Sequence, residues 1–142
     1  MPVESHEKRK VALTQLETAL RIFAEGTDYY SVVTLAGAAD EIFGKLLESR
    51  GGITAIASLT RASVAIHQIV HGVPGDEKSY ADRANLARNA LKHLRAGGEL
   101  SVDLDIYQEA VDMLDRAISN YWALTNSLSP AMESFEQLRR AT

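Results

Sequence analysis

The chain of 142 residues contains no cysteine and only three prolines. The absence of cysteine excludes disulfide bridges, thiolate metal ligands and cysteine nucleophiles. Because no apolar run reaches about 18 residues, we expect no membrane-spanning helix. The polar segment 1–10 also lacks the apolar region of a secretory signal. These absences together lead us to expect a cytoplasmic protein.

An excess of basic residues is absent as well, since 15 Lys and Arg are outnumbered by 19 Asp and Glu. A general nucleic-acid coat protein would carry a basic surface, so the net charge of −4 argues against one. An enzyme that contacts a few phosphates at one cleft stays compatible with this charge, provided that its basic patch is local. With 46% hydrophobic and 24% charged residues, we expect one globular domain over residues 1–142.

Apolar residues recur with the period of an α-helix between glycine-containing breaks, and the glycines are spaced as helix C-caps are. The pattern predicts a short C-terminal helix with Ser129 as N-cap and Pro130 at its first position. Thr27 or Asp28 is the expected N-cap of the second helix. The longer predicted helices cover residues 5–25, 28–49, 53–71, 78–95 and 103–128. Short turns favour antiparallel neighbours, so we expect an all-α antiparallel bundle of about five helices plus the short one.

Two of these helices have apolar stretches that bear on packing. The stripe of the third helix consists of Ile56, Leu59, Ile66 and Val70, which we expect to face the core. The second helix contains the run Leu-Ala-Gly-Ala-Ala at residues 35–39, whose small side chains let another helix approach closely. This run is either a tight crossing inside the bundle or a subunit interface.

The residues most suited to catalysis or binding lie in the fourth predicted helix, between Asn85 and His93. Arg88 and Lys92 are four residues apart and share one helix face, as do Asn85 and Asn89. Arg88 and His93 are five residues apart and therefore lie on the same broad side of the helix. The segment gathers two permanent cations, one imidazole and two amides within about two turns.

That grouping is suited to cleavage of an RNA phosphodiester. Arg88 offers a planar, always charged fork for a phosphate. His93 can exchange protons with a ribose 2′-hydroxyl or a leaving oxygen at neutral pH, and Asn89 can orient either group. Because RNA supplies its own 2′-hydroxyl nucleophile, such a catalyst needs only proton transfer and charge stabilisation, and we expect no metal or other cofactor.

The string Arg88-Asn89-x-x-x-His93 on a late helix of a small α-bundle resembles the signature of the HEPN superfamily. The second helix, over residues 29–42, is also similar to HEPN helices, in which an Ala-rich face carries acidic residues. The resemblance covers most of the chain as architecture but only positions 88–93 as a motif.

The resemblance implies a homodimer that places two copies of the motif at one interface cleft. It also implies a metal-independent ribonuclease of a toxin–antitoxin, defence or RNA-processing system, with Arg88 and His93 as catalytic residues supported by Asn89. RNA would be the substrate, and a cognate antitoxin protein would be a further partner. Other members have lost catalysis and bind only RNA or a protein, so a non-catalytic module is an alternative. In a purely structural interpretation, Arg88, Lys92 and Arg95 form a solvated basic face and His93 is half-buried.

Asp40 and Glu41 lie inside the apolar stretch of the second helix, where an ionised side chain is costly unless it is paired. Either one of them approaches Arg88 or His93 and fixes its orientation, or both lie at the edge of the buried face in contact with water. We include both, together with Lys92 and Asn85, among the candidate binding residues.

His67 and His71 share one face of the third helix at a spacing that could bind a metal. A third ligand would have to come from elsewhere, for instance His93 or Asp76, and there is no His-Glu-x-x-His. A metal-binding bundle is therefore a second alternative. His71 is also a candidate binding residue, because the loop over residues 72–79 leads from it to the helix with the motif.

Overall fold

The computed structural model describes residues 1–142 and consists of seven α-helices without a β-strand, so the all-α prediction is confirmed. The packing of these helices is that of a bundle. None of them combines the length and the apolar character needed to cross a membrane. The bounds are α1 Lys8–Glu25, α2 Tyr29–Ser49, α3 Ala55–His71, α4 Glu77–Ala84, α5 Leu86–Lys92, α6 Ile106–Thr125 and α7 Pro130–Ala141.

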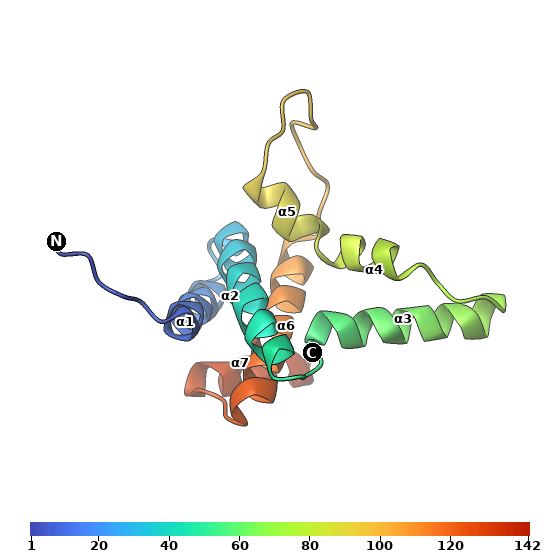
Figure 1. Ribbon diagram of the computed structural model, residues 1–142. Coiled ribbons are helices and arrows are strands. Elements are labelled where there is room, and N and C mark those ends of the chain that lie inside the picture. Colours follow the sequence, from blue (N-terminus) through green and yellow to red (C-terminus); the bar gives the residue numbers. More distant parts are fainter.

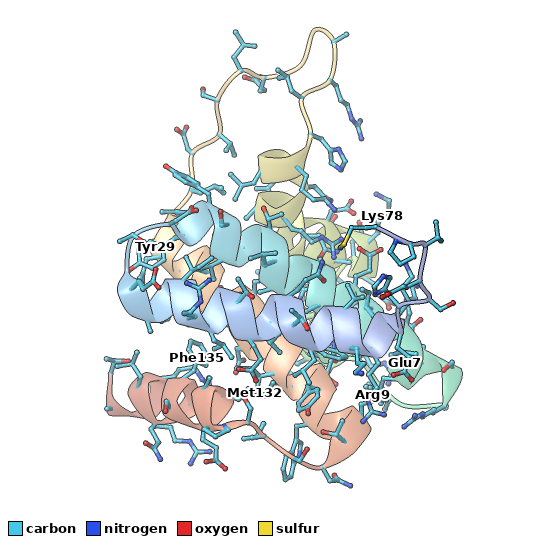
Figure 2. All side chains as sticks on the ribbon, turned by 90° about the vertical axis from the view of Figure 1, so that its left-hand side faces the viewer. Glu7, Arg9, Tyr29, Lys78, Met132 and Phe135 are labelled. Carbon is cyan, nitrogen blue, oxygen red and sulfur yellow. The ribbon has the colours of Figure 1, made fainter.

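The hydrophobic core lies among α1, α2, α6 and α7, with α2 packed between α1 and α6 (Figure 1). Ala87 of α5 is the one member of the core from the middle of the chain. Figure 2 shows Met132 and Phe135 of α7 between that helix and α1, where both side chains are buried. The largest fully buried side chains of the core are those of Phe43, Leu16, Met113, Leu114 and Met132.

The helix ends follow the local signals of the sequence. Gly26 ends α1 in the left-handed conformation at φ 71°, which glycine adopts without a steric penalty. Asp28, and not Thr27, is the N-cap of α2, because its carboxylate accepts a hydrogen bond from the Ser31 amide at 3.0 Å. The predicted start of the last helix is confirmed, since the Ser129 hydroxyl accepts from the Met132 amide.

The Ala-rich run of α2 forms a crossing within the chain. Ala36, Gly37 and Ala39 are buried. The side chain of Arg88 from α5 lies directly over Gly37, where an added Cβ would come within 2.7 Å of Arg88 Cδ. The small residues therefore allow α5 to approach α2, and the interpretation as a tight crossing inside the bundle is confirmed.

The predicted continuous helix over residues 78–95 is wrong, because α4 ends at Ala84 and α5 begins at Leu86. The Arg116 guanidinium of α6 explains the break: Nη1 donates to the Ala84 carbonyl at 2.9 Å, and Nη2 donates to Asn85 Oδ1 at 3.0 Å. The first of these bonds satisfies the Ala84 carbonyl, one of the acceptors that the end of α4 leaves without an intrahelical partner. Residues 93–105 form a loop that extends outward from the bundle (Figure 1).

The expected burial of the third helix is also wrong. Only Thr60 of α3 is buried, whereas Leu59, Ile66 and Val70 are all exposed. Figure 1 shows α3 extending away from the four-helix core as an arm, with α4 lying along it. The period of the apolar residues correctly predicted a helix, but no other element of the chain covers the apolar face.

Candidate functional site

Arg88 lies where α5 crosses α2, and its side chain is 15% exposed. Packing over Gly37 restricts the aliphatic part of this side chain. Its nearest acid is Glu41, with 3.9 Å between Arg88 Nη1 and Glu41 Oε2. Arg88 Nε is buried without a hydrogen-bond partner. The guanidinium is therefore well positioned but only weakly paired, because Glu41 is more than half exposed to water.

A buried polar cluster lies next to Arg88, on the inner side of α2. Asp40 Oδ2 accepts from Arg116 Nη2 at 2.7 Å, and Asp40 Oδ1 accepts from Asn120 Nδ2 at 2.9 Å. The side chains of Asp40 and Arg116 are only 4% and 8% exposed. Burial raises the pKa of Asp40 above its ordinary value, and the positive charge of Arg116 acts in the opposite direction. Because each carboxylate oxygen has its own donor, the pair is held in one geometry.

The two acidic residues of α2 therefore have different roles. Asp40 is buried and pairs with Arg116, a residue that the sequence interpretation did not include, and not with Arg88 or His93. Glu41 is exposed to water, and its carboxylate approaches Arg88. The missed residues Arg116 and Asn120 are four positions apart on α6, on the face that also carries buried Met113. Polar residues at helical spacing within a buried stripe were the signal that could have identified them.

A small polar cleft of about 180 Å³ lies beside this cluster. Its volume is below that of pockets for drug-sized ligands, which begin near ~300 Å³, so it has room for one phosphate-sized group. It lies between α2, α5, α6 and the beginning of α3. The residues that line it are Asp40, Glu41, Gly44, Lys45, Glu48, Thr54, Ile56, Asn85, Arg88, Arg116 and Asn120.

His93 lies elsewhere, directly after the last residue of α5, with extended backbone angles of φ −127° and ψ 134°. It is exposed and lines an open cleft of about 750 Å³ between α5 and the loop over residues 93–105. Asn89, Lys92 and Arg95 line the same cleft. The structure thus brings Asn89, Lys92 and His93 together but places Arg88 and Asn85 in the small polar cleft.

The imidazole rings of His67 and His71 lie next to one another at the outer end of the arm, with their planes tilted by 47°. Their ring centroids are 4.5 Å apart, and His67 Nδ1 forms a 2.8 Å hydrogen bond with the Val73 carbonyl. No three His, Cys, Asp or Glu side chains are grouped in a way that could hold a metal ion, so neither His93 nor Asp76 completes a site. His71 lines neither of the two clefts.

Comparison with known proteins gives no match: no family model fits the chain, and no curated protein or solved structure is significantly similar to it. The resemblance to the HEPN superfamily therefore depends on positions 88–93 and on the helical architecture. Any function has to be argued from the chemistry of the two clefts.

Proposed function

We propose that this chain is a HEPN-like ribonuclease that cleaves RNA without a metal ion, with Arg88 as the phosphate-binding residue and His93 as the proton-transfer residue. Asn89 orients them, and the active form is a homodimer. The proposal depends mainly on Arg88. Its side chain is fixed over Gly37, but its guanidinium has only a long ion pair, with 3.9 Å between Nη1 and the Glu41 carboxylate.

A phosphate would bind Arg88 more strongly than Glu41 does. A planar guanidinium forms short, bidentate hydrogen bonds with phosphate oxygens, whereas a long ion pair with an exposed carboxylate contributes about 0–1 kcal/mol. Arg88 Nε is buried without a hydrogen-bond partner, so the guanidinium does not use all of its donors. An RNA phosphate in place of Glu41 would give Nη1 a closer acceptor than the carboxylate oxygen 3.9 Å away.

The cleft of His93 supports the other half of the chemistry. Its imidazole is exposed, as a group that exchanges protons with a polymeric substrate has to be. Lys92 and Arg95 supply positive charge to this cleft, which Asp82 and Glu99 also line. Contacts with RNA phosphates would come from these two cations.

The homodimer is part of the proposal because Arg88 and His93 of one chain line different clefts. A second copy can supply His93 to the Arg88 of the first, in keeping with the paired motifs that the HEPN resemblance implies. In the reaction, a base takes the proton of a 2′-hydroxyl, O2′ attacks phosphorus, and the 5′-oxygen leaves with a proton. The products are a 2′,3′-cyclic phosphate and a 5′-hydroxyl.

RNA cleavage in the presence of EDTA tests the proposal. We expect His93→Ala and Arg88→Ala each to lower the cleavage rate at least about 100-fold. A substrate with a 2′-deoxyribose at the cleaved position should remain intact. His71→Ala is the matched control, because it removes an exposed histidine that lines neither cleft. Cleavage by His93→Ala at the wild-type rate would show that the proposal is wrong.

A non-catalytic module that binds RNA or a protein is the second candidate, favoured by the low exposure of Arg88 and by its place in a different cleft from His93. In that case no cyclic phosphate forms, and RNA binding depends on Lys92 and Arg95 more than on His93. The cognate antitoxin and the cytoplasmic location both stay predictions. The metal-binding alternative through His67 and His71 lacks a third ligand within the chain.

A further inference from the structure

Two histidines that the proposed reaction does not use lie in the last turns of α3, at the outer end of the arm (Figure 1). His67 and His71 are four residues apart, so both side chains lie on the same face of the helix. Their ring centroids are 4.5 Å apart, and the planes of the rings are tilted by 47°. Because His67 is only half-buried and His71 is exposed, a ligand from the solvent can reach both rings.

The hydrogen bond of His67 determines which of its ring nitrogens is free. His67 Nδ1 lies 2.8 Å from the Val73 carbonyl oxygen, which can only accept, so Nδ1 carries the proton. In the neutral ring, Nε2 then keeps its lone pair and can bind a cation. Histidine ligands of metals usually have this arrangement, in which the other ring nitrogen donates to a backbone carbonyl or a carboxylate. The loop after α3 therefore holds His67 in the tautomer that a metal ligand needs.

The distance between the two rings fits one metal ion bound by both. A bond from a ring nitrogen to a metal is about 2.0–2.1 Å long, which places the ion about 3.2 Å from the ring centroid. Two such rings that coordinate at a right angle have centroids roughly 4.5 Å apart, whereas tetrahedral coordination separates the centroids by roughly 5.2 Å. The observed 4.5 Å agrees with the right angle. Right-angled coordination by nitrogen ligands is typical of Cu²⁺ and Ni²⁺ and not of Zn²⁺.

The position at the end of a helix also favours a cation. α3 ends at His71, and the last carbonyl groups of a helix give this end a partial negative charge. No third His, Cys, Asp or Glu side chain is grouped with the pair, so water would fill the remaining coordination positions of the ion. Such a site takes up its metal reversibly from the solvent and is not part of the core.

We propose that His67 and His71 chelate one Cu²⁺ ion, with water in its remaining coordination positions. The site is separate from the proposed ribonuclease, because that reaction uses no metal and neither histidine lines the clefts of Arg88 and His93. RNA cleavage is measured in EDTA and copper binding without RNA, so either result can fail while the other stands.

Calorimetric titration of the full chain with CuCl₂ tests the site. The wild type should bind one Cu²⁺ ion, and His67→Ala and His71→Ala should each weaken binding about 100-fold, because the ion loses one of two linked contacts. His6→Ala is the matched control, because it removes an exposed histidine from the polar segment before α1. It should leave the site intact. A wild type that does not bind Cu²⁺ would overturn the proposal, and so would binding that His71→Ala leaves unchanged.

Electron paramagnetic resonance of the copper complex tests the geometry. The wild type should give a tetragonal Cu²⁺ spectrum with hyperfine splitting from two nitrogen ligands, and His71→Ala should lose one of them. In the same titration Ni²⁺ should bind at least as tightly as Zn²⁺, because Zn²⁺ prefers tetrahedral angles. Tighter binding of Zn²⁺ than of Ni²⁺ would overturn the right-angled coordination. A far-ultraviolet circular dichroism spectrum confirms that each variant is folded.

Discussion

Helices α2 and α3 have a similar apolar character in sequence but opposite environments in the structure. α2 lies between α1 and α6 and has buried residues in every turn, among them Val32, Ala36 and Phe43. α3 has one buried residue, Thr60, and exposes its apolar stripe along the arm. An apolar stripe at helical spacing therefore predicts a face that has to be covered, but it does not identify the element that covers it.

The difference begins at the first residues of α3. Asn120 Oδ1, inside the polar cluster, accepts a hydrogen bond from the Ala55 amide at 2.8 Å. Thr54, which is buried, caps the helix by accepting from the Ala57 amide. These contacts fix the beginning of α3 against the four-helix core, and the rest of the helix extends outward (Figure 1). Polar contacts at one end, and not apolar burial along its length, position the arm.

The largest effect should come from cavity formation in the core. Phe43→Ala is expected to lower the free energy of unfolding by about 3 to 5 kcal/mol, because Phe43 is completely buried and packs on Tyr121. Ile66→Ala on the arm should change it by less than about 0.5 kcal/mol in the monomer. Urea unfolding at low protein concentration makes this comparison. Equal losses in the two variants would show that the arm is as well packed as the core.

Loss of the buried arginine should have the next largest effect. Arg116→Ala is expected to destabilise the chain by about 3 kcal/mol or more, because it leaves Asp40 buried without its charge partner. Arg139→Ala is the matched control on the surface. Its ion pairs with Asp115 and Glu136 are partly exposed, so its loss should cost about 0–1 kcal/mol in the same urea measurement. Equal stability of the two variants would show that the buried pair of Asp40 and Arg116 contributes no more than a surface ion pair.

Alanine substitutions at two glycines of α2 test whether RNA cleavage depends on the position of the Arg88 side chain and not on the stability of the fold. Gly37→Ala should displace the Arg88 side chain, because its Cβ would come within 2.7 Å of Cδ. Gly44→Ala places its Cβ at ordinary contact distances of 3.5 Å. We expect both variants to remain within about 1 kcal/mol of the wild-type stability. Only Gly37→Ala should lower RNA cleavage, by about tenfold or more. Equal cleavage by the two variants would contradict a role for the position of Arg88.

The smallest expected effect concerns the pH dependence of stability. Burial raises the pKa of Asp40, so the folded chain keeps this proton to a higher pH than the unfolded chain, in which Asp40 titrates near 3.8. The contribution of this proton to the free energy of unfolding has its full value below pH 3.8. It is lost as the pH rises through the raised pKa of Asp40. The free energy of unfolding of the wild type minus that of Asp40→Asn should therefore fall as the pH rises. A rise of this signed difference with pH would mean that Arg116 outweighs burial.

Much of the local structure could be predicted from the sequence. The caps at Asp28 and Ser129 and the glycine that ends α1 act within a few residues, so their effects can be read from the chain. The break at Asn85 could not be predicted, because its cause is the side chain of Arg116, 31 residues further along. The separation of Arg88 and His93 follows from the end of α5 at Lys92, which lies between them.

The sequence by itself determined that this protein is helical, where most of its helices begin and end, and which residues could act on a phosphodiester. It did so because hydrogen bonds within a helix, caps and apolar periodicity depend on neighbours a few positions away. Only the tertiary structure decided that Asp40 pairs with Arg116, that Arg88 and His93 line different clefts, and that the apolar stripe of α3 is uncovered. These features depend on contacts between residues far apart in the chain. The sequence alone was compatible with several partners for each of these side chains and faces.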